Sequence, residues 1–495
     1  MSRALLVAWA VFLVGALTHP LLAPGDLALR DMLVLDSPAL SPSAVGFGDL
    51  PARNAPQDGV LALVGLLVDA SWFARLLIVA GAGTGAFGAA RLARVVNPRA
   101  SAWAVAAAMT VAVWNPFVVE RLLQGQWSLV IAAWLLPLVA AAALSGRVYL
   151  SAATVFAASL TPTGALMASL VAVATARSWA ARAGLLLAGA AVSVPWLVPG
   201  FLGAADSLAS SAAAFAPRAE QFVGTPGALL GLGGIWNADA VPASRENGFA
   251  LFGVALAAVL LTAWRRCPAP LLILTGLGLG GATLAWLAPE LMGLFVSEVP
   301  GGGLLRDSQK LVMLAIPGYV ALAGLLSRWP AVAALALALL QVPDAPRELQ
   351  QLRPVEIAVD TQLVERADGR DVYFPGRGTL VELDGRVILD PYARALSKVE
   401  SGELRVDSHV TDLPTRRYQA VERAWAAGDL GLLERLGVGL IVTPDGQVTE
   451  TAAAPQPTRT GVALTLWWLA VGALLTYLAT RRSSSSKRRP VSSHE

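Results

Sequence analysis

The sequence has few of the side chains that bind metals or cross-link chains. Its 495 residues include one cysteine, Cys267, and three histidines, His19, His409 and His494, which lie far apart. A single cysteine excludes an internal disulfide and a cysteine-based metal site. The histidine spacing argues against a histidine-rich metal site. A carboxylate-bound divalent cation, Mg²⁺ or Mn²⁺, is the cofactor that this composition still allows.

Charged residues are also scarce. They make up 14% of the chain, against roughly 25% in soluble proteins, and 56% of the residues are hydrophobic. The net charge of +3 is small and unevenly placed, so nothing indicates a nucleic-acid partner. Apolar runs long enough to approach the ~30 Å of a hydrocarbon layer recur along the sequence. The composition therefore predicts a polytopic membrane protein with the lipid bilayer as its surroundings.

Twelve apolar segments are predicted to be helices in the membrane. They are Ala4–Leu22, Trp72–Ala90, Ala102–Trp114, Trp127–Leu144, Val148–Leu160, Gly164–Ala176, Leu185–Leu202, Phe249–Trp264, Leu271–Leu287, Leu311–Leu326, Ala331–Val342 and Val462–Ala479. The pair at 148–176 is expected either to span the membrane or to be re-entrant. Ala331–Val342 is short, since a dozen residues rise only ~18 Å as a helix. This segment is nevertheless predicted to span the membrane, because without it the basic tail would lie on the outer face.

The loop charges orient these segments. Loops after odd-numbered segments contain the acids, whereas loops after even-numbered segments contain arginine and almost no acid. The positive-inside rule then places both termini in the cytoplasm of a multi-pass plasma-membrane protein. The predicted parts are a transmembrane domain at 1–342, whose acidic first outer loop is 24–71, an extracytoplasmic α/β domain at 343–460, a last helix at 461–480 and a basic cytoplasmic tail at 481–495.

The predicted outer domain contains short strands and a helix. Asp371–Phe374, Thr379–Leu383 and Arg386–Leu389 alternate as strands do, and Asp384–Gly385 is a hairpin signal. Leu413–Arg435 is predicted to be helical with a break at Gly428, and Gly439–Thr443 to be a buried strand. The fold class expected is therefore a polytopic α-helical membrane protein of about 12 spans with a small α/β domain.

One motif is expected to be spurious. Gly83, Gly85 and Gly88 match a G-x-G-x-x-G dinucleotide fingerprint, but they lie within an apolar helix that no strand precedes. Small residues there, including Gly81-x-x-x-Gly85, favour close approach of two membrane helices instead.

Three predicted outer segments combine charge with nearness to the membrane. The first is the loop Asp26–Asp69, the second is Trp114–Trp127, and the third is Gly301–Lys310. Charges at the end of an apolar segment are costly unless they are paired or hydrated. The neighbours Glu120–Arg121 and Arg306–Asp307 are therefore candidate ion pairs. The alternative is a phosphate site, because Arg306 and Lys310 can share a helix face.

These segments resemble a known family. The layout, with NPFVVERLLQGQWSL, LLRDSQK and LLERLGVGLIVT, is similar to the GT-C superfamily of membrane glycosyltransferases, and more narrowly to actinobacterial envelope arabinosyl- and mannosyltransferase-like proteins. The resemblance implies transfer of a sugar from a polyprenyl-phosphate donor to a cell-envelope glycan or glycolipid. It also implies a catalytic carboxylate in the first outer loop, near the end of the first span.

The resemblance implies specific roles. A base must take a proton from the acceptor hydroxyl, and Asp31 is the first candidate and Asp49 the second. Cations must stabilise the leaving phosphate. The candidates for this role are Arg30, Arg53, Arg121, Arg306 and Lys310. Residues expected to support the site or contact the acceptor are Asp36, Asp58, Glu120, Gln124, Gln126, Asp307 and Gln309.

Two other functions fit the same layout. A transporter or flippase of lipid-linked sugars would place ionisable residues within the spans and often contains internal repeats, neither of which is clear here. A non-catalytic scaffold of an envelope-assembly complex would tolerate loss of Asp31 and Asp49.

Overall fold

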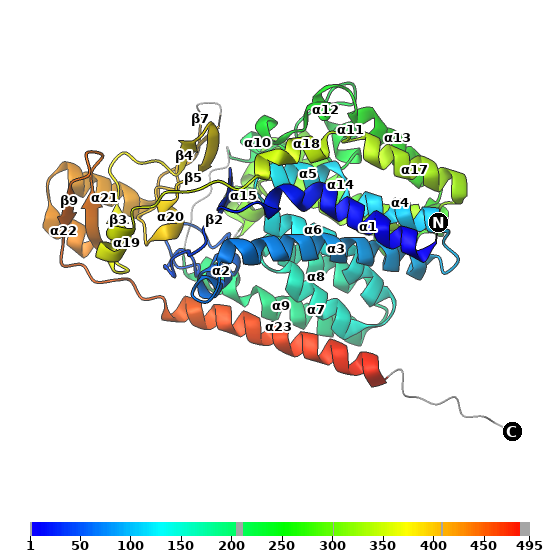
Figure 1. Cartoon of the computed structure of the whole chain (residues 1–495), viewed down its shortest axis with the longest axis horizontal. Coiled ribbons are helices and arrows are strands. Elements are labelled where there is room, and N and C mark those ends of the chain that lie inside the picture. The colour runs from blue at the N-terminus through cyan, green and yellow to red at the C-terminus, as the bar shows by residue number, and fades with distance from the viewer. Residues whose placement is uncertain (1, 204–210, 300, 407–408, 486–495) are drawn as a thin grey trace.

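The computed structural model describes residues 2–203, 211–299, 301–406 and 409–485. A bundle of helices forms one part of the molecule, and small sheets and short helices gather at one end of that bundle (Figure 1). The N-terminus and the far end of the last helix, α23 (Arg459–Ser485), lie at the opposite end. Both ends of the described chain are thus on the same side of the bundle, as the predicted topology requires.

In the described ranges, nine helices are long and apolar enough to cross a membrane. Three shorter apolar helices, α7, α8 and α13, coincide with predicted segments. The helices of the bundle are α1 (Arg3–Thr18), α3 (Ala70–Val96), α4 (Ala102–Val113), α5 (Pro116–Leu123), α6 (Trp127–Leu144), α7 (Val148–Ala158), α8 (Pro162–Thr175), α9 (Trp179–Leu202), α13 (Ala250–Leu261), α14 (Ala269–Leu287), α16 (Ile316–Leu325), α17 (Arg328–Leu340) and α23.

Two predicted segments differ in extent from the structure. The third segment breaks at Asn115–Pro116 as expected, but the apolar run continues through α5 to Leu123. Asn115 caps α5 by accepting a hydrogen bond from the amide of Val118. The eleventh segment is longer than its apolar core, because the candidate span begins at Arg328 and extends to Leu352.

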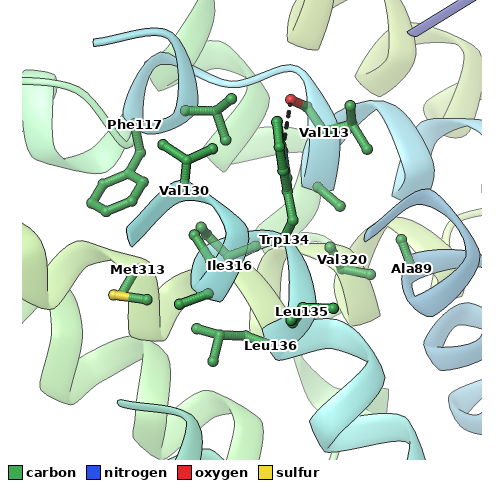
Figure 2. Close-up of a cluster of buried hydrophobic side chains, with 14 of the residues drawn as sticks. Ala89, Val113, Phe117, Val130, Trp134, Leu135, Leu136, Met313, Ile316 and Val320 are labelled. Carbon is green, nitrogen blue, oxygen red and sulfur yellow. Dashed lines mark hydrogen bonds between the residues drawn. The ribbon is translucent and has the colours of Figure 1, made fainter. Parts of the chain in front are cut away.

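The centre of the bundle is the contact between α3 and α6. A methyl group at Gly85 would lie 2.8 Å from Cβ of Trp134, and one at Gly88 would lie 2.8 Å from both Cβ and the amide nitrogen of Leu138. These glycines therefore permit close helix packing, and the dinucleotide interpretation is excluded as expected. Trp134 is fully buried and donates from its indole to the carbonyl of Val113 (Figure 2).

The sheets at the end of the bundle are small. β3 (Asp371–Tyr373) pairs in parallel with β8 (Val438–Val442), and β9 (Val448–Glu450) pairs antiparallel with β8. β4 (Leu380–Leu383) and β5 (Arg386–Leu389) form the predicted hairpin, and β6 (Leu404–Val406) pairs with β7 (His409–Asp412). The flanking helices are α19 (Thr361–Ala367), α20 (Tyr392–Ala395), α21 (Arg416–Ala426) and α22 (Leu430–Arg435).

Several predicted local features of this region are confirmed. Asp384 and Gly385 both have positive φ, at 49° and 72°, as the hairpin turn requires. Gly428, with φ 69°, separates α21 from α22. β8 is buried in the sheet where a strand was expected at 439–443. The outer location of 343–460 stays a prediction, and residues 486–495 of the predicted tail lie outside the described residues.

Candidate functional site

Asp31 lies at the tip of a short hairpin in the first loop. β1 (Leu27–Leu29) and β2 (Met32–Val34) are antiparallel and are joined by a two-residue turn, Arg30–Asp31. Arg30 has φ 48°, a left-handed conformation that is uncommon for a residue with a side chain. The turn therefore projects the carboxylate of Asp31 out of the hairpin, where it is exposed.

The hairpin tip is fixed by its backbone. The amide of Asp31 donates to the carbonyl of Gln124, 3.1 Å away. Gly125, with φ 85°, presses against the tip so closely that a Cβ there would collide with the amide of Met32 and the carbonyl of Leu29. On its other side Arg30 exchanges backbone hydrogen bonds with β5, donating to Val387 at 2.8 Å and accepting from Leu389 at 3.3 Å. The tip is thus held between the α5–α6 turn and β5.

A chain of side-chain hydrogen bonds leads from Asp31 into the bundle. Nε2 of Gln126 donates to Oδ2 of Asp31 at 3.0 Å, and Oε1 of Gln126 accepts from Nη1 of Arg121 at 2.8 Å. Arginine only donates and an ionised carboxylate only accepts, so this amide orientation satisfies both partners. Gln126 thereby transmits the position of the fully buried Arg121 to Asp31.

Arg121 pairs with the third charged segment. Its Nη1 and Nη2 contact both oxygens of Asp307, at 2.5 and 2.8 Å, and Nε donates to Oε1 of Gln309 at 3.1 Å. Lys310 Nζ lies 3.7 Å from Oδ2 of the same Asp307. Burial acts to raise the pKa of Asp307, but Arg121 and Lys310 outweigh it and hold the pKa below its ordinary value. The structure brings four predicted site residues together here.

Arg53 and Arg306 add two cations beside Asp31. Burial lowers the pKa of Arg53 to about 10, Arg306 acts in the same direction, and Asp412 and Asp31 oppose it. Arg306, Asp412 and Asp31 therefore each lie within electrostatic range of Arg53. Arg306 Nη1 contacts both oxygens of Asp412 on β7, at 2.6 and 2.8 Å, and its guanidinium lies 4.2 Å from the ring centre of Phe215.

Arg53 differs from its charged neighbours. It is half-buried, yet its guanidinium forms no hydrogen bond or ion pair with any residue in the described ranges. Lys310 interacts electrostatically with both Asp31 and Arg53. We call Asp31, Arg53, Arg306 and Lys310 the tip cluster. It combines one exposed carboxylate with three cations, which is a surface that can receive an anion next to a proton acceptor.

The structure separates other predicted site residues from the tip cluster. The guanidinium of Arg30 donates to the backbone carbonyls of Leu123 and Asp239, at 2.6 and 2.5 Å. These contacts do not support the role in phosphate binding that was expected of Arg30. Asp49 accepts from the amide of Glu400 and pairs with Arg417 at 3.1 Å. Burial raises the pKa of Asp49, with Arg417 acting against it. Asp49 therefore joins the first loop to the sheet region.

The remaining first-loop acids also have structural partners. Asp36 accepts from the hydroxyl of Ser71, and Asp58 pairs with Arg394 at 2.9 Å. Both contacts connect segments that are distant in the sequence, and neither acid touches the tip cluster. Their expected supporting role is thus limited to holding the loop in place.

The predicted ion pairs between sequence neighbours are wrong. Arg121 pairs with Asp307, not with Glu120, because adjacent side chains on a helix point in different directions. Glu120 is buried and accepts from the amide of Ile235 at 3.0 Å. Gln124 accepts from Asn237 at 2.7 Å, and Gln309 donates to the carbonyl of Gly233 at 3.1 Å. All three residues anchor the 211–248 segment to the site.

Sequence reasoning missed two further contacts of the site. Asp412 is 106 positions from Arg306 in the sequence, and Glu220 forms a fully buried ion pair with Arg245 behind Glu120. No local pattern signals either contact, because each joins segments brought together only by the fold.

The residues around Asp31 do not fit a divalent cation. Asp307 and Asp412, the neighbouring carboxylates, are each bound to arginine. No group of three His, Cys, Asp or Glu side chains that could hold a metal occurs within the described ranges. We therefore derive no step through a metal ion.

Comparisons with known proteins agree with this architecture. No protein-family model and no curated protein matches the sequence. Among solved structures, the fold matches that of the arabinofuranosyltransferase AftD from Mycobacteria, with a TM-score of 0.50 and 18% sequence identity. The match covers 90% of this chain and 37% of the AftD chain.

The fold is that of a polytopic helical protein whose architecture resembles that of AftD. AftD, an arabinosyl-transferring enzyme, is the kind of protein that the sequence is expected to resemble, so that expectation is confirmed at the level of the fold. The chain spans little more than a third of the AftD chain, and at this identity the likeness concerns architecture.

Proposed function

We propose that this chain is a membrane glycosyltransferase that moves a sugar from a polyprenyl-phosphate donor to a cell-envelope glycan or glycolipid on the outer face of the plasma membrane. The observation that carries the proposal is the unpartnered guanidinium of Arg53 beside the exposed carboxylate of Asp31. A cation without a counter-ion favours an anionic ligand. The AftD-like fold supports the reaction class.

The tip cluster suits the charge changes of an inverting transfer. Asp31 accepts the proton of the acceptor hydroxyl as that oxygen bonds to the anomeric carbon. The bond from the anomeric carbon to the phosphate oxygen breaks, and its electron pair leaves with the lipid phosphate. Arg53, Lys310 and Arg306 stabilise the negative charge that develops on that oxygen. No external oxidant or reductant is needed.

Gln126 and Arg121 position the base in this scheme. The buried, bidentate pair with Asp307 holds Arg121 in place. Nη1 of Arg121 is therefore a fixed donor to Oε1 of Gln126. The amide nitrogen of Gln126 then aims at one oxygen of Asp31 and leaves the other free for the acceptor. Such preorganisation is how a rigid bundle places a reacting group.

The proposal is tested with the full chain in lipid nanodiscs. Transfer from a polyprenyl-phosphate sugar is measured for wild type, for Asp31→Asn and for Asp69→Asn, a control exposed in the same loop whose side chain makes no cap hydrogen bond. Transfer is expected to fall roughly 10²–10⁴-fold in Asp31→Asn, with binding of a polyprenyl-phosphate analogue retained, and to be unchanged in Asp69→Asn.

The opposite results identify the alternatives. Wild-type transfer by Asp31→Asn would exclude Asp31 as the base, and loss of transfer in Asp49→Asn with retained folding would give Asp49 that role. Transbilayer movement of the lipid-linked sugar without transfer would identify a flippase. Binding to envelope-assembly proteins with neither activity would identify a scaffold.

A further inference from the structure

A cavity lies in the sheet region, away from the tip cluster. It encloses about 630 Å³, within the roughly 300–1,000 Å³ typical of small-ligand sites. Its walls come from α19, from the loop that follows β3 and from the loop that follows β8. It therefore opens at the carboxyl ends of two parallel strands, where α/β sheets commonly bind ligands.

One wall of the cavity is aromatic. The rings of Phe374 and Tyr392 stack with centroids 4.9 Å apart and an interplanar angle of 28°. The guanidinium of Arg377 lies over both rings, 4.9 Å from the centre of Tyr392 and 5.7 Å from that of Phe374. A flat apolar face next to N–H donors matches a ligand that is apolar on one side and hydroxylated at its edge.

Both arginines that line the cavity are already paired with carboxylates. Arg377 donates from Nε and Nη2 to Asp390, at 2.8 Å each, and Lys398 contacts the same carboxylate at 2.6 Å. Arg366 is paired with Glu450 at 2.7 Å. Each of these guanidinium groups thus has a carboxylate partner, in contrast to Arg53, although Asp390 also pairs with Lys398 and Glu450 with Arg370. The carboxylate of Asp360 lines the same cavity and would repel an anion. The cavity therefore favours a neutral polar ligand over a phosphate.

The rest of the rim offers hydrogen-bond partners of both kinds. Asp360 caps α19 through one oxygen, Oδ1, at 2.9 and 3.1 Å from the amides of Gln362 and Leu363, so its second oxygen can accept from a ligand. The exposed amide of Gln362 can both donate and accept. Hydroxyl groups, which also do both, match this rim.

The cavity is connected to the hairpin tip. Leu389 on β5 donates its amide to the carbonyl of Arg30, next to Asp31. Tyr392 follows Leu389 by three residues, which span at most about 11 Å. A chain-like ligand seated on Tyr392 can therefore extend toward Asp31.

We propose that the cavity between Tyr392, Arg377 and Asp360 binds a neutral saccharide unit of the acceptor glycan and holds the chain so that its end reaches Asp31. The inference rests on the proposed transferase function and names the binding site of its acceptor. Ring C–H groups of the sugar pack on the Phe374–Tyr392 stack, and its hydroxyls bond to Asp360, Gln362 and Arg377.

Binding is tested without donor, so that its result is independent of transfer. The probes are a tetra-arabinofuranoside and mannotetraose, added to the full chain in nanodiscs and followed by saturation-transfer NMR and titration. Wild type is expected to bind at least one probe. Tyr392→Ala and Gln362→Ala should weaken that binding, by about tenfold or more for the aromatic truncation. Glu365→Ala, on the same helix but outside the cavity lining, should not.

Several results would overturn the inference. These are the binding of neither saccharide by folded wild type, wild-type binding by Tyr392→Ala, and competition of inorganic phosphate with the saccharide for the cavity. Asp31→Asn and Arg53→Gln should still bind the saccharide at wild-type strength. Loss of saccharide binding in those variants would move the acceptor site to the tip cluster, whereas loss of transfer alone concerns the proposed function.

Discussion

Gln126 donates a hydrogen bond to Asp31 across 3.0 Å, and this contact is the link between the exposed carboxylate and the buried charges of the bundle. We predict that Gln126→Leu lowers kcat by roughly 10- to 100-fold, because a displaced base is less well aligned. KM for the donor should change little. Gln124→Leu is the matched control, since the side chain of Gln124 contacts Asn237 and only its backbone carbonyl, which the substitution keeps, contacts Asp31. A rise in KM with unchanged kcat would show that Gln126 binds substrate instead of positioning the base.

Arg53 provides a clean test of the anion site. It has no counter-ion in the described part of the protein, so Arg53→Gln should leave the free energy of unfolding within about 0.5 kcal/mol of wild type. Binding of a polyprenyl-phosphate analogue should weaken by about tenfold or more. Arg417→Gln is the contrasting variant, because Arg417 pairs with Asp49 and Asp371 and should lose stability. Undiminished analogue binding in Arg53→Gln/Lys310→Ala would remove the phosphate assignment.

The Arg121–Asp307 pair predicts a strong effect on stability. Arg121→Met removes the bidentate partner of the buried Asp307 and leaves Lys310 as its ion-pair partner, 3.7 Å away, which should destabilise the fold by about 3–5 kcal/mol. Asp307→Asn in the same chain should recover much of this loss, because the buried carboxylate that lost Arg121 is then neutral. Reversible unfolding in mixed detergent measures both variants. Equal stability of the single and double variants would show that the two residues are not coupled.

Asp390 predicts a pH dependence in the sheet region. Although burial acts to raise its pKa, Arg377 and Lys398 hold the pKa below its ordinary value of 3.8. A carboxyl group with a depressed pKa contributes stability that is full above its unfolded pKa and is lost as pH falls through the folded pKa. Unfolding of the sheet region should therefore become easier below about pH 4. Asp390→Asn should remove this acid sensitivity, and an unchanged profile would contradict the prediction.

Membrane orientation remains a prediction that fusions can decide. Reporters placed at Gly446, between β8 and β9 of the sheet region, and at Ser492 are expected on opposite sides, with the first outside and the second in the cytoplasm. The shared location of the N-terminus and the far end of α23 at one end of the bundle agrees with this arrangement (Figure 1). Equal signals from the two fusions would place both sites on the same side of the membrane and would contradict this topology.

Local signals predicted most of the secondary structure. The apolar runs gave the bundle helices, and turn residues such as Asp384–Gly385 gave the β4–β5 hairpin. The β1–β2 hairpin was missed because its strands have three residues each and are fully buried, so they lack alternation. β6 and β9 also have three residues each and β7 has four, and their pairing is decided by tertiary contacts.

The site was predicted less completely than the fold. Asp31, Arg53, Arg306 and Lys310 were chosen as charged residues near predicted span ends, and the structure brings them together. Their partners were not predictable, because Arg121 meets Asp307 across 186 positions and Arg306 meets Asp412 across 106. Long-range pairing depends on how the helices pack, which a single sequence does not encode in any local pattern.

The lack of a side chain at Gly125 allows the α5–α6 turn to lie directly against the β1–β2 tip. Its α-carbon rests against the backbone of the β1–β2 tip, and even a methyl group would collide with Met32 and Leu29. The position of the β1–β2 tip is therefore set in part by contact between two stretches of main chain. Directed evolution of acceptor preference should accordingly recover glycine at 125 in every functional variant.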